Sequence, residues 1–188
     1  MSELPSIART ASRPALRRPK RGGRIGAAML LAMTSISVAV VMHASAAMAR
    51  EVTLTTTMDM NFRGIGGYLI IYVLDKDGGY VSTLHAAGRS TRYYNQFRSW
   101  WRATGTARVD RQKEFDAVTG PSLTRGEVLT LTVDLPDALF DAGYVIKIDS
   151  TVQDGRDFPS DVIAPLATEA DGQKVLGGGY VLDFVIDL

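Results

Sequence analysis

The sequence predicts a mainly β protein, an antiparallel immunoglobulin-like β-sandwich with one short helical insertion. Three observations carry this expectation: at least six segments have the apolar pattern of strands, turn residues separate them, and one segment has helical spacing. The 188 residues include no cysteine. The fold must therefore be held together by a hydrophobic core, without disulfide bonds.

Two segments near the start of the domain give the clearest strand signals. EVTLTTTMDM, residues 51–60, alternates apolar and threonine side chains, which is typical of a strand with one buried face. GYLIIYVLD contains a continuous β-branched and aromatic run over residues 68–74, which is typical of a strand buried on both faces. We expect these two strands to pair.

A hairpin is predicted directly after this run. Asp77 and Gly78 tolerate the positive φ angles of a tight turn, and residues 80–84 have the composition of a returning strand. Three further strands are expected over residues 128–136, 143–152 and 179–188. The segments rich in Gly, Asp and Pro over residues 154–161 and 168–179 are interpreted as surface loops.

One segment has a helical period. In STRYYNQFRSWWRAT, residues 90–104, Tyr93, Phe97 and Trp101 recur at i and i+4, while the arginines fall at other positions. This spacing predicts a short amphipathic helix inserted between strands.

The first 49 residues have the three parts of a secretory signal. Seven Lys and Arg against one acid in residues 1–24 precede an uncharged apolar run, Ile25–Val41, and small residues stand at Ala47 and Ala49. We expect a signal peptide over residues 1–49, cleaved between Ala49 and Arg50, and a single β-sandwich domain over residues 50–188. The alternative is an N-terminal membrane anchor that stays attached.

Removal of this signal changes the charge of the protein. Arg50–Leu188 holds 14 basic and 19 acidic residues, a net charge of −5, which disfavours a nucleic-acid partner. Within it, Arg89–Lys113 has seven basic residues and one acid, whereas Glu114–Leu188 has four basic residues and fourteen acids. The sequence thus concentrates positive charge in the segment that is predicted to be helical.

This basic segment is the first candidate binding site. Arg92, Arg98 and Arg102 are interleaved with aromatic residues, among them Trp100 and Trp101. Arginine side chains with neighbouring rings are suited to docking a partner protein or binding an anionic aromatic ligand. In the alternative interpretation the rings are core anchors and the arginines form a solvated helix face.

Catalytic and metal-binding chemistry has little support in the composition. His85 is the one histidine left after the signal, which excludes a multi-histidine metal centre within one chain and leaves a hydrolase dependent on His85 as a minor alternative. Asp154, Asp157 and Asp161 share one segment, but their spacing matches no calcium-loop pattern. We expect a binding protein rather than an enzyme, with no metal site.

Several motifs in order resemble a known family. These are GYLIIYVLDKDGGYVSTLHAAGRSTRYYNQFRSWWR, DAVTGPS, DAGYVIKIDS, QDGRD and GGGYVLDFVIDL. Together they resemble the DUF2271 family of predicted periplasmic proteins over essentially the whole mature chain. DAGYVIKI is also similar to the immunoglobulin-like domain of flagellar hook-capping proteins.

The family resemblance implies a location and a set of partners. It implies a small periplasmic protein whose family genes accompany PepSY-type membrane proteins and flavin transferases. A role beside a membrane-bound system for electron transfer or metal uptake would follow, with Arg92, Arg98 and Arg102 docking the partner.

DAVTGPS further resembles the acceptor motif of proteins that carry covalent FMN. Asp116, Thr119 and Gly120 match this motif, Pro121 stands where alanine is usual, and Ser122 occupies the acceptor position. The resemblance implies a second function class, a flavoprotein electron carrier with FMN on Ser122, stacked against Trp100 or Trp101. The alternative is a plain loop built by Gly-Pro turn chemistry.

Overall fold

A computed structural model describes residues 48–64, 66–88 and 91–188, without the side chains of residues 91 and 115–118. The predicted signal peptide lies outside these residues except for its last two. The strands are β1 Ala49–Met58, β2 Gly67–Leu74, β3 Tyr80–Ala87, β4 Thr119–Gly120, β5 Val128–Pro136, β6 Val145–Val152, β7 Phe158–Pro165, β8 Lys174–Leu176 and β9 Val181–Asp187. The helices are α1 Arg98–Thr106 and α2 Arg111–Val118, with 3₁₀ turns η1 Thr91–Gln96, η2 Asp137–Leu139 and η3 Thr168–Ala170.

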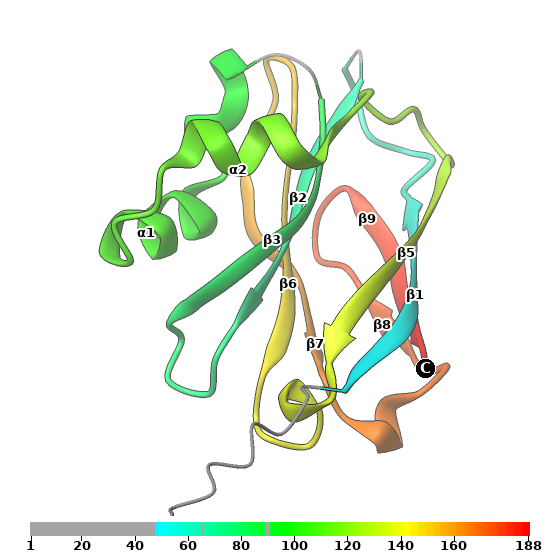
Figure 1. The fold of residues 1–188 in the computed structure, drawn as a ribbon. Coiled ribbons are helices and arrows are strands. Elements are labelled where there is room, and N and C mark those ends of the chain that lie inside the picture. Colours follow the sequence, from blue (N-terminus) through cyan, green and yellow to red (C-terminus); the bar gives the residue numbers. More distant parts are fainter. Residues whose placement is uncertain (1–47, 65, 89–90) are drawn as a thin grey trace, which may run out of the picture. The chain divides into compact units, whose positions relative to one another are not determined.

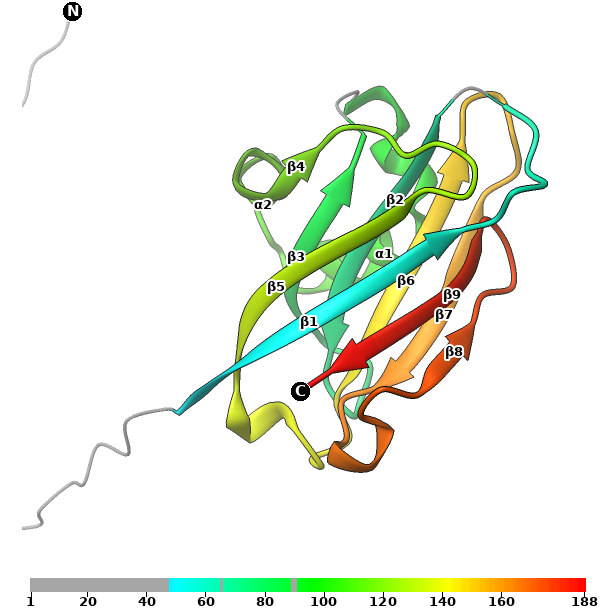
Figure 2. The same cartoon turned by 90° about the vertical axis from the view of Figure 1, so that its right-hand side faces the viewer.

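The strands form two sheets packed face to face, which confirms the predicted sandwich. One sheet has the order β5-β1-β9-β8 and the other has the order β4-β3-β2-β6-β7 (Figures 1 and 2). All pairs are antiparallel except β3 with the two-residue strand β4. The order β3-β2-β6-β7 matches strands C′, C, F and G of a variable-type immunoglobulin domain, and β5-β1 matches E and B; β9 takes the place of strand A beside β1 but comes last in the chain.

The helical insertion covers the outer face of the five-stranded sheet (Figure 1). Of the helix expected over residues 90–104, the described part is the turn η1 followed by α1, and α2 follows in the chain. All eight residues of β2 are buried, as predicted, because one face packs in the sandwich core and the other packs under the insertion. Tyr94, Phe97 and Trp100 form the helical side of this second core.

The expected pairing of the first two strands is wrong. β1 pairs with β5 and β9, whereas β2 pairs with β3 and β6 in the other sheet. The patterns show the reason: β1 buries alternate residues on one face only, while β2 needs cover on both faces. The segment between them crosses from one sheet to the other.

Two segments interpreted as loops contain strands. β7 begins within residues 154–161 and continues to Pro165, and β8 lies within residues 168–179. The sequence of β7 lacks the usual apolar pattern of a strand because Asp161, an acid, occupies a buried position. The backbone is also irregular there, since Ser160 has a φ of 61°. The predicted hairpin is confirmed between β2 and β3, although only Gly78 of the predicted pair has a positive φ.

Candidate functional site

Helix α1 is anchored to the sheet by an acid from a distant strand. The residue before its first turn is Phe97, which has no side-chain acceptor for the free N–H groups at the start of the helix. Asp149 on β6 provides one, because its Oδ2 accepts a hydrogen bond of 2.9 Å from the backbone nitrogen of Trp100. A carboxylate in this place also interacts favourably with the positive end of the helix dipole.

Both carboxylate oxygens of Asp149 accept hydrogen bonds from within the fold. Asp149 is 1% exposed, and its Oδ1 accepts hydrogen bonds from the Tyr72 hydroxyl at 3.1 Å and from the Ser160 backbone at 2.8 Å. Burial, followed by the charge of Asp149, raises the pKa of the Tyr72 hydroxyl far above its ordinary value. Tyr72 therefore remains a donor at every physiological pH.

The two tryptophans of the predicted site have different surroundings. Trp100 is 0% exposed, and its Nε1 donates a hydrogen bond of 2.9 Å to the Thr83 hydroxyl. Trp101 is 41% exposed, with the Arg111 guanidinium 3.8 Å from its ring centroid. Trp100 is thus a core anchor with no ring face open to a flavin, and Trp101 has one face covered by a cation.

The three predicted docking arginines lie on neighbouring elements. Arg98 and Arg102 are one turn apart on α1, and both are exposed. Arg92 is exposed on η1, and its guanidinium lies 5.8 Å from the Tyr93 ring centroid. The Arg98 Nε atom lies 3.2 Å from an oxygen of Asp157. Arg102 forms no ion pair with any carboxylate of the described residues.

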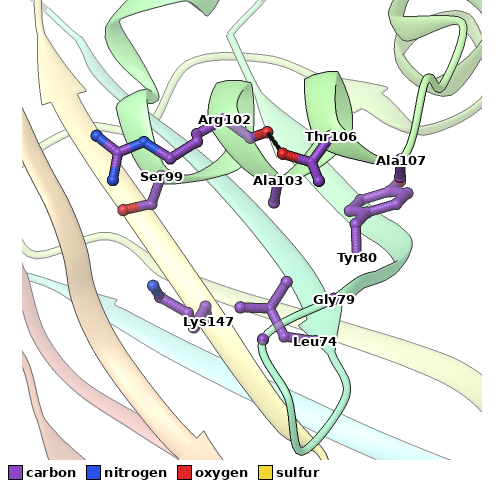
Figure 3. Close-up of a pocket in the computed structure, with 10 residues that line it drawn as sticks. Leu74, Gly79, Tyr80, Ser99, Arg102, Ala103, Thr106, Ala107 and Lys147 are labelled. Atoms are coloured by element: carbon purple, nitrogen blue, oxygen red, sulfur yellow. Dashed lines mark hydrogen bonds between the residues drawn. The ribbon is translucent and has the colours of Figure 1, made fainter.

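A pocket of about 450 Å³ lies beneath α1, beside Arg102. No sequence pattern predicted it. Helix α1, the β2–β3 hairpin and β6 form its walls (Figure 3). The polar ends of Ser99, Arg102 and Lys147 lie at one end of the pocket. Leu74, Tyr80, Ala103 and Thr106 are among the residues that line the rest of it.

The predicted flavin segment combines three kinds of local structure. Residue 116 lies in the second half of α2, and its side chain is outside the described part; Thr119 and Gly120 form β4. The plain-loop interpretation is therefore correct only after Gly120. Ser122 is exposed, and a Cβ atom added to Gly66 would lie 3.0 Å from its Oγ.

His85 lies directly against this segment. A Cβ atom added to Gly120 would be 3.0 Å from His85 Cε1 and 3.1 Å from Nε2, so close packing on the imidazole is a structural reason for glycine at position 120. Burial lowers the pKa of His85, which keeps the ring neutral near pH 7. We therefore interpret His85 as a residue packed near the edge of the five-stranded sheet.

The three aspartates of residues 154–161 do not converge on a metal site. Asp161 accepts hydrogen bonds from backbone N–H groups, Asp157 pairs with Arg98, and Asp154 is exposed. Within the described residues no group of His, Asp and Glu is arranged to hold a metal ion. One signal was missed: Lys147 and Asp149 are charged residues on one face of β6 and alternate there with Ile146 and Ile148 of the other face.

Comparison with known proteins supports the resemblance seen in the motifs. A family model described as "Predicted periplasmic protein (DUF2271)" matches residues 49–183. No curated protein and no solved structure shows significant similarity to the chain. In the part of the chain that the structure describes, no helix is long and apolar enough to cross a membrane.

Proposed function

Because the chain belongs to the DUF2271 family of predicted periplasmic proteins, we propose that it is a non-catalytic accessory protein of the periplasm. In this proposal it docks onto a membrane-bound partner, such as a PepSY-type protein of a redox or metal-uptake system, through the exposed face of α1. The observation that carries the proposal is Arg102, an exposed arginine without an ion pair among the described residues, one position from the exposed Trp101.

The geometry supports docking in two ways. Asp149 and the buried ring of Trp100 fix α1 on the sheet, so little conformational freedom is lost when a partner binds its outer face. Arginine and tryptophan are also the side chains that most often dominate interface energies. Since most of the domain is acidic, positive charge on α1 would orient the protein toward an acidic partner surface.

Replacing Arg102 by Glu tests this function. We expect the variant to capture a membrane partner from detergent-solubilised membranes at least about tenfold less well than the wild type, because an attractive charge becomes a repulsive one. Wild-type capture should also weaken as salt is raised. The measurement is quantitative pull-down of the same partner band by both proteins at equal concentration.

Arg63 provides the matched control. It is exposed in the β1–β2 segment, so Arg63→Glu makes the same charge change away from α1. Equal capture by the Arg102→Glu and wild-type proteins, or equal loss in both variants, contradicts docking through α1. The unfolding midpoint of each variant checks that the domain is intact.

The second candidate is the FMN carrier, and the exposed hydroxyl of Ser122 favours it because a transferase must reach that oxygen. Co-expression with a flavin transferase is expected to give a protein band that stays fluorescent after denaturation. Ser122→Ala should abolish the fluorescence, whereas Thr130→Ala, at an exposed residue outside the motif, should keep it. A dark wild-type band, or a fluorescent Ser122→Ala band, rejects this candidate.

A further inference from the structure

The pocket beside α1 brings two cations together at one end. Lys147 and Arg102 both line it, and neither forms an ion pair with a carboxylate of the described residues. Lys147 is half-buried on β6. Positive charge that is taken partly out of water is ordinarily compensated by an anion.

The acid whose charge acts on Lys147, Asp149, already accepts hydrogen bonds within the fold. Asp149 accepts three hydrogen bonds from Tyr72, Trp100 and Ser160, so its oxygens face those donors. Burial lowers the pKa of Lys147 and the neighbouring Arg102 lowers it further, although the charge of Asp149 opposes both effects. An anion bound from solution would supply the missing compensation.

The remainder of the pocket is mostly apolar, and the hydroxyl of Thr106, which also lines it, donates a hydrogen bond to the Arg102 carbonyl. The Tyr80 hydroxyl donates to Glu114 and lies 2.7 Å from the Thr83 hydroxyl, so the ring is fixed as a wall. Leu74 and Ala103 lie between this ring and the charged end of the pocket (Figure 3). Its volume of about 450 Å³ lies within the range of roughly 300–1,000 Å³ that small-molecule sites occupy.

We propose that this pocket binds a small organic acid, with the carboxylate held between Lys147 and Arg102 and the apolar body against Leu74, Tyr80 and Ala103. This site shares Arg102 with the docking face of α1, but its second cation, Lys147, lies on β6, under the helix. An inorganic anion would satisfy the cations alone and would leave the apolar wall without a contact. An organic acid matches both ends of the pocket.

Titration of the ¹⁵N-labelled protein, expressed from the full-length chain, with 4-phenylbutyrate and octanoate tests the site. We expect saturable shifts of the amides of Gly79, Ser99 and Lys147, with dissociation constants of about 1 mM or lower. The neutral 4-phenylbutanamide should bind at least about tenfold more weakly, because it lacks the charge that the two cations select. Acetate, which lacks the apolar body, should also bind more weakly.

Variants assign the binding to the two cations. Lys147→Gln is expected to weaken 4-phenylbutyrate binding by about tenfold or more, because one charge-assisted contact is lost. Arg102→Gln should weaken 4-phenylbutyrate binding by a similar factor. Because Arg102 is exposed, this variant should fold even if Lys147→Gln does not. Arg98→Gln, one turn away and outside the pocket, should bind as the wild type does.

Three results would overturn the proposal. These are no saturable binding of either acid, equal binding of acid and amide, or unchanged binding in both the Lys147→Gln and Arg102→Gln proteins. Partner capture by Lys147→Gln separates this site from the docking proposal. In Lys147→Gln, normal capture with lost acid binding supports two distinct functions, whereas lost capture would place Lys147 in the docking surface and contradict this separation.

Discussion

Asp161→Asn is expected to lower the free energy of unfolding by about 3 kcal/mol or more. Asp161 on β7 is 6% exposed, and its carboxylate accepts hydrogen bonds from the backbone N–H groups of residues 178–181 at 2.6–3.0 Å. The Ser150 hydroxyl donates a fifth hydrogen bond. An asparagine would keep one oxygen, remove the charge and turn an NH₂ group toward other donors.

Denaturant unfolding of Asp161→Asn against the wild type measures this effect. Asp154→Asn is the matched control, since Asp154 is exposed and asparagine tolerates its positive φ of 58°. We expect the control to stay within about 0.5 kcal/mol of the wild type. A loss below about 1 kcal/mol in Asp161→Asn would show that the loop over residues 177–180 does not depend on this carboxylate.

Asp149→Asn is expected to have the second-largest effect, with a loss of about 2–3 kcal/mol. Asparagine can keep the hydrogen bonds from Tyr72 and Ser160 through its oxygen, but its NH₂ group then faces the backbone N–H of Trp100. The first turn of α1 loses its acceptor and its favourable charge. The damage should therefore concentrate on the helix rather than on the sheets.

Tryptophan fluorescence and near-ultraviolet circular dichroism can separate these outcomes. Loosening of α1 should shift the emission of the buried Trp100 to longer wavelength while the far-ultraviolet strand signal is retained. Tyr72→Phe removes one of the three hydrogen bonds and should cost about 1 kcal/mol without moving the helix. Identical spectra for Asp149→Asn and the wild type would contradict an anchoring role for Asp149.

Strand positions were predictable from local pattern, whereas strand partners were not. β5 has the predicted bounds, and β2 is buried on both faces as its composition predicted. The β1–β2 pairing failed because periodicity indicates which face is apolar but carries no information about the sheet that a strand joins. β7 was missed because its inward-facing acid is satisfied by a loop much later in the chain.

The candidate site was predictable only in its helical part. The sequence identified the arginines of α1 and the tryptophans beside them, but it left open whether the rings lie in the core or at the surface. In the structure Trp100 lies in the core and Trp101 lies at the surface. The partnership of Arg102 with Lys147 depends on how α1 docks onto β6. The hydrogen bond between Asp149 and the backbone of Trp100 helps to hold α1 on β6, and these two residues are 49 positions apart in the sequence.

The neighbours of β1 have a consequence for the order of assembly. β1 pairs with β5 on one side and with β9 on the other, so the first strand of the domain cannot complete its sheet until the last strand has been delivered. Contacts so distant in sequence slow folding, and they leave the growing chain with unpaired edges. The sheet that contains β1 is therefore expected to form only after β9 has been synthesised.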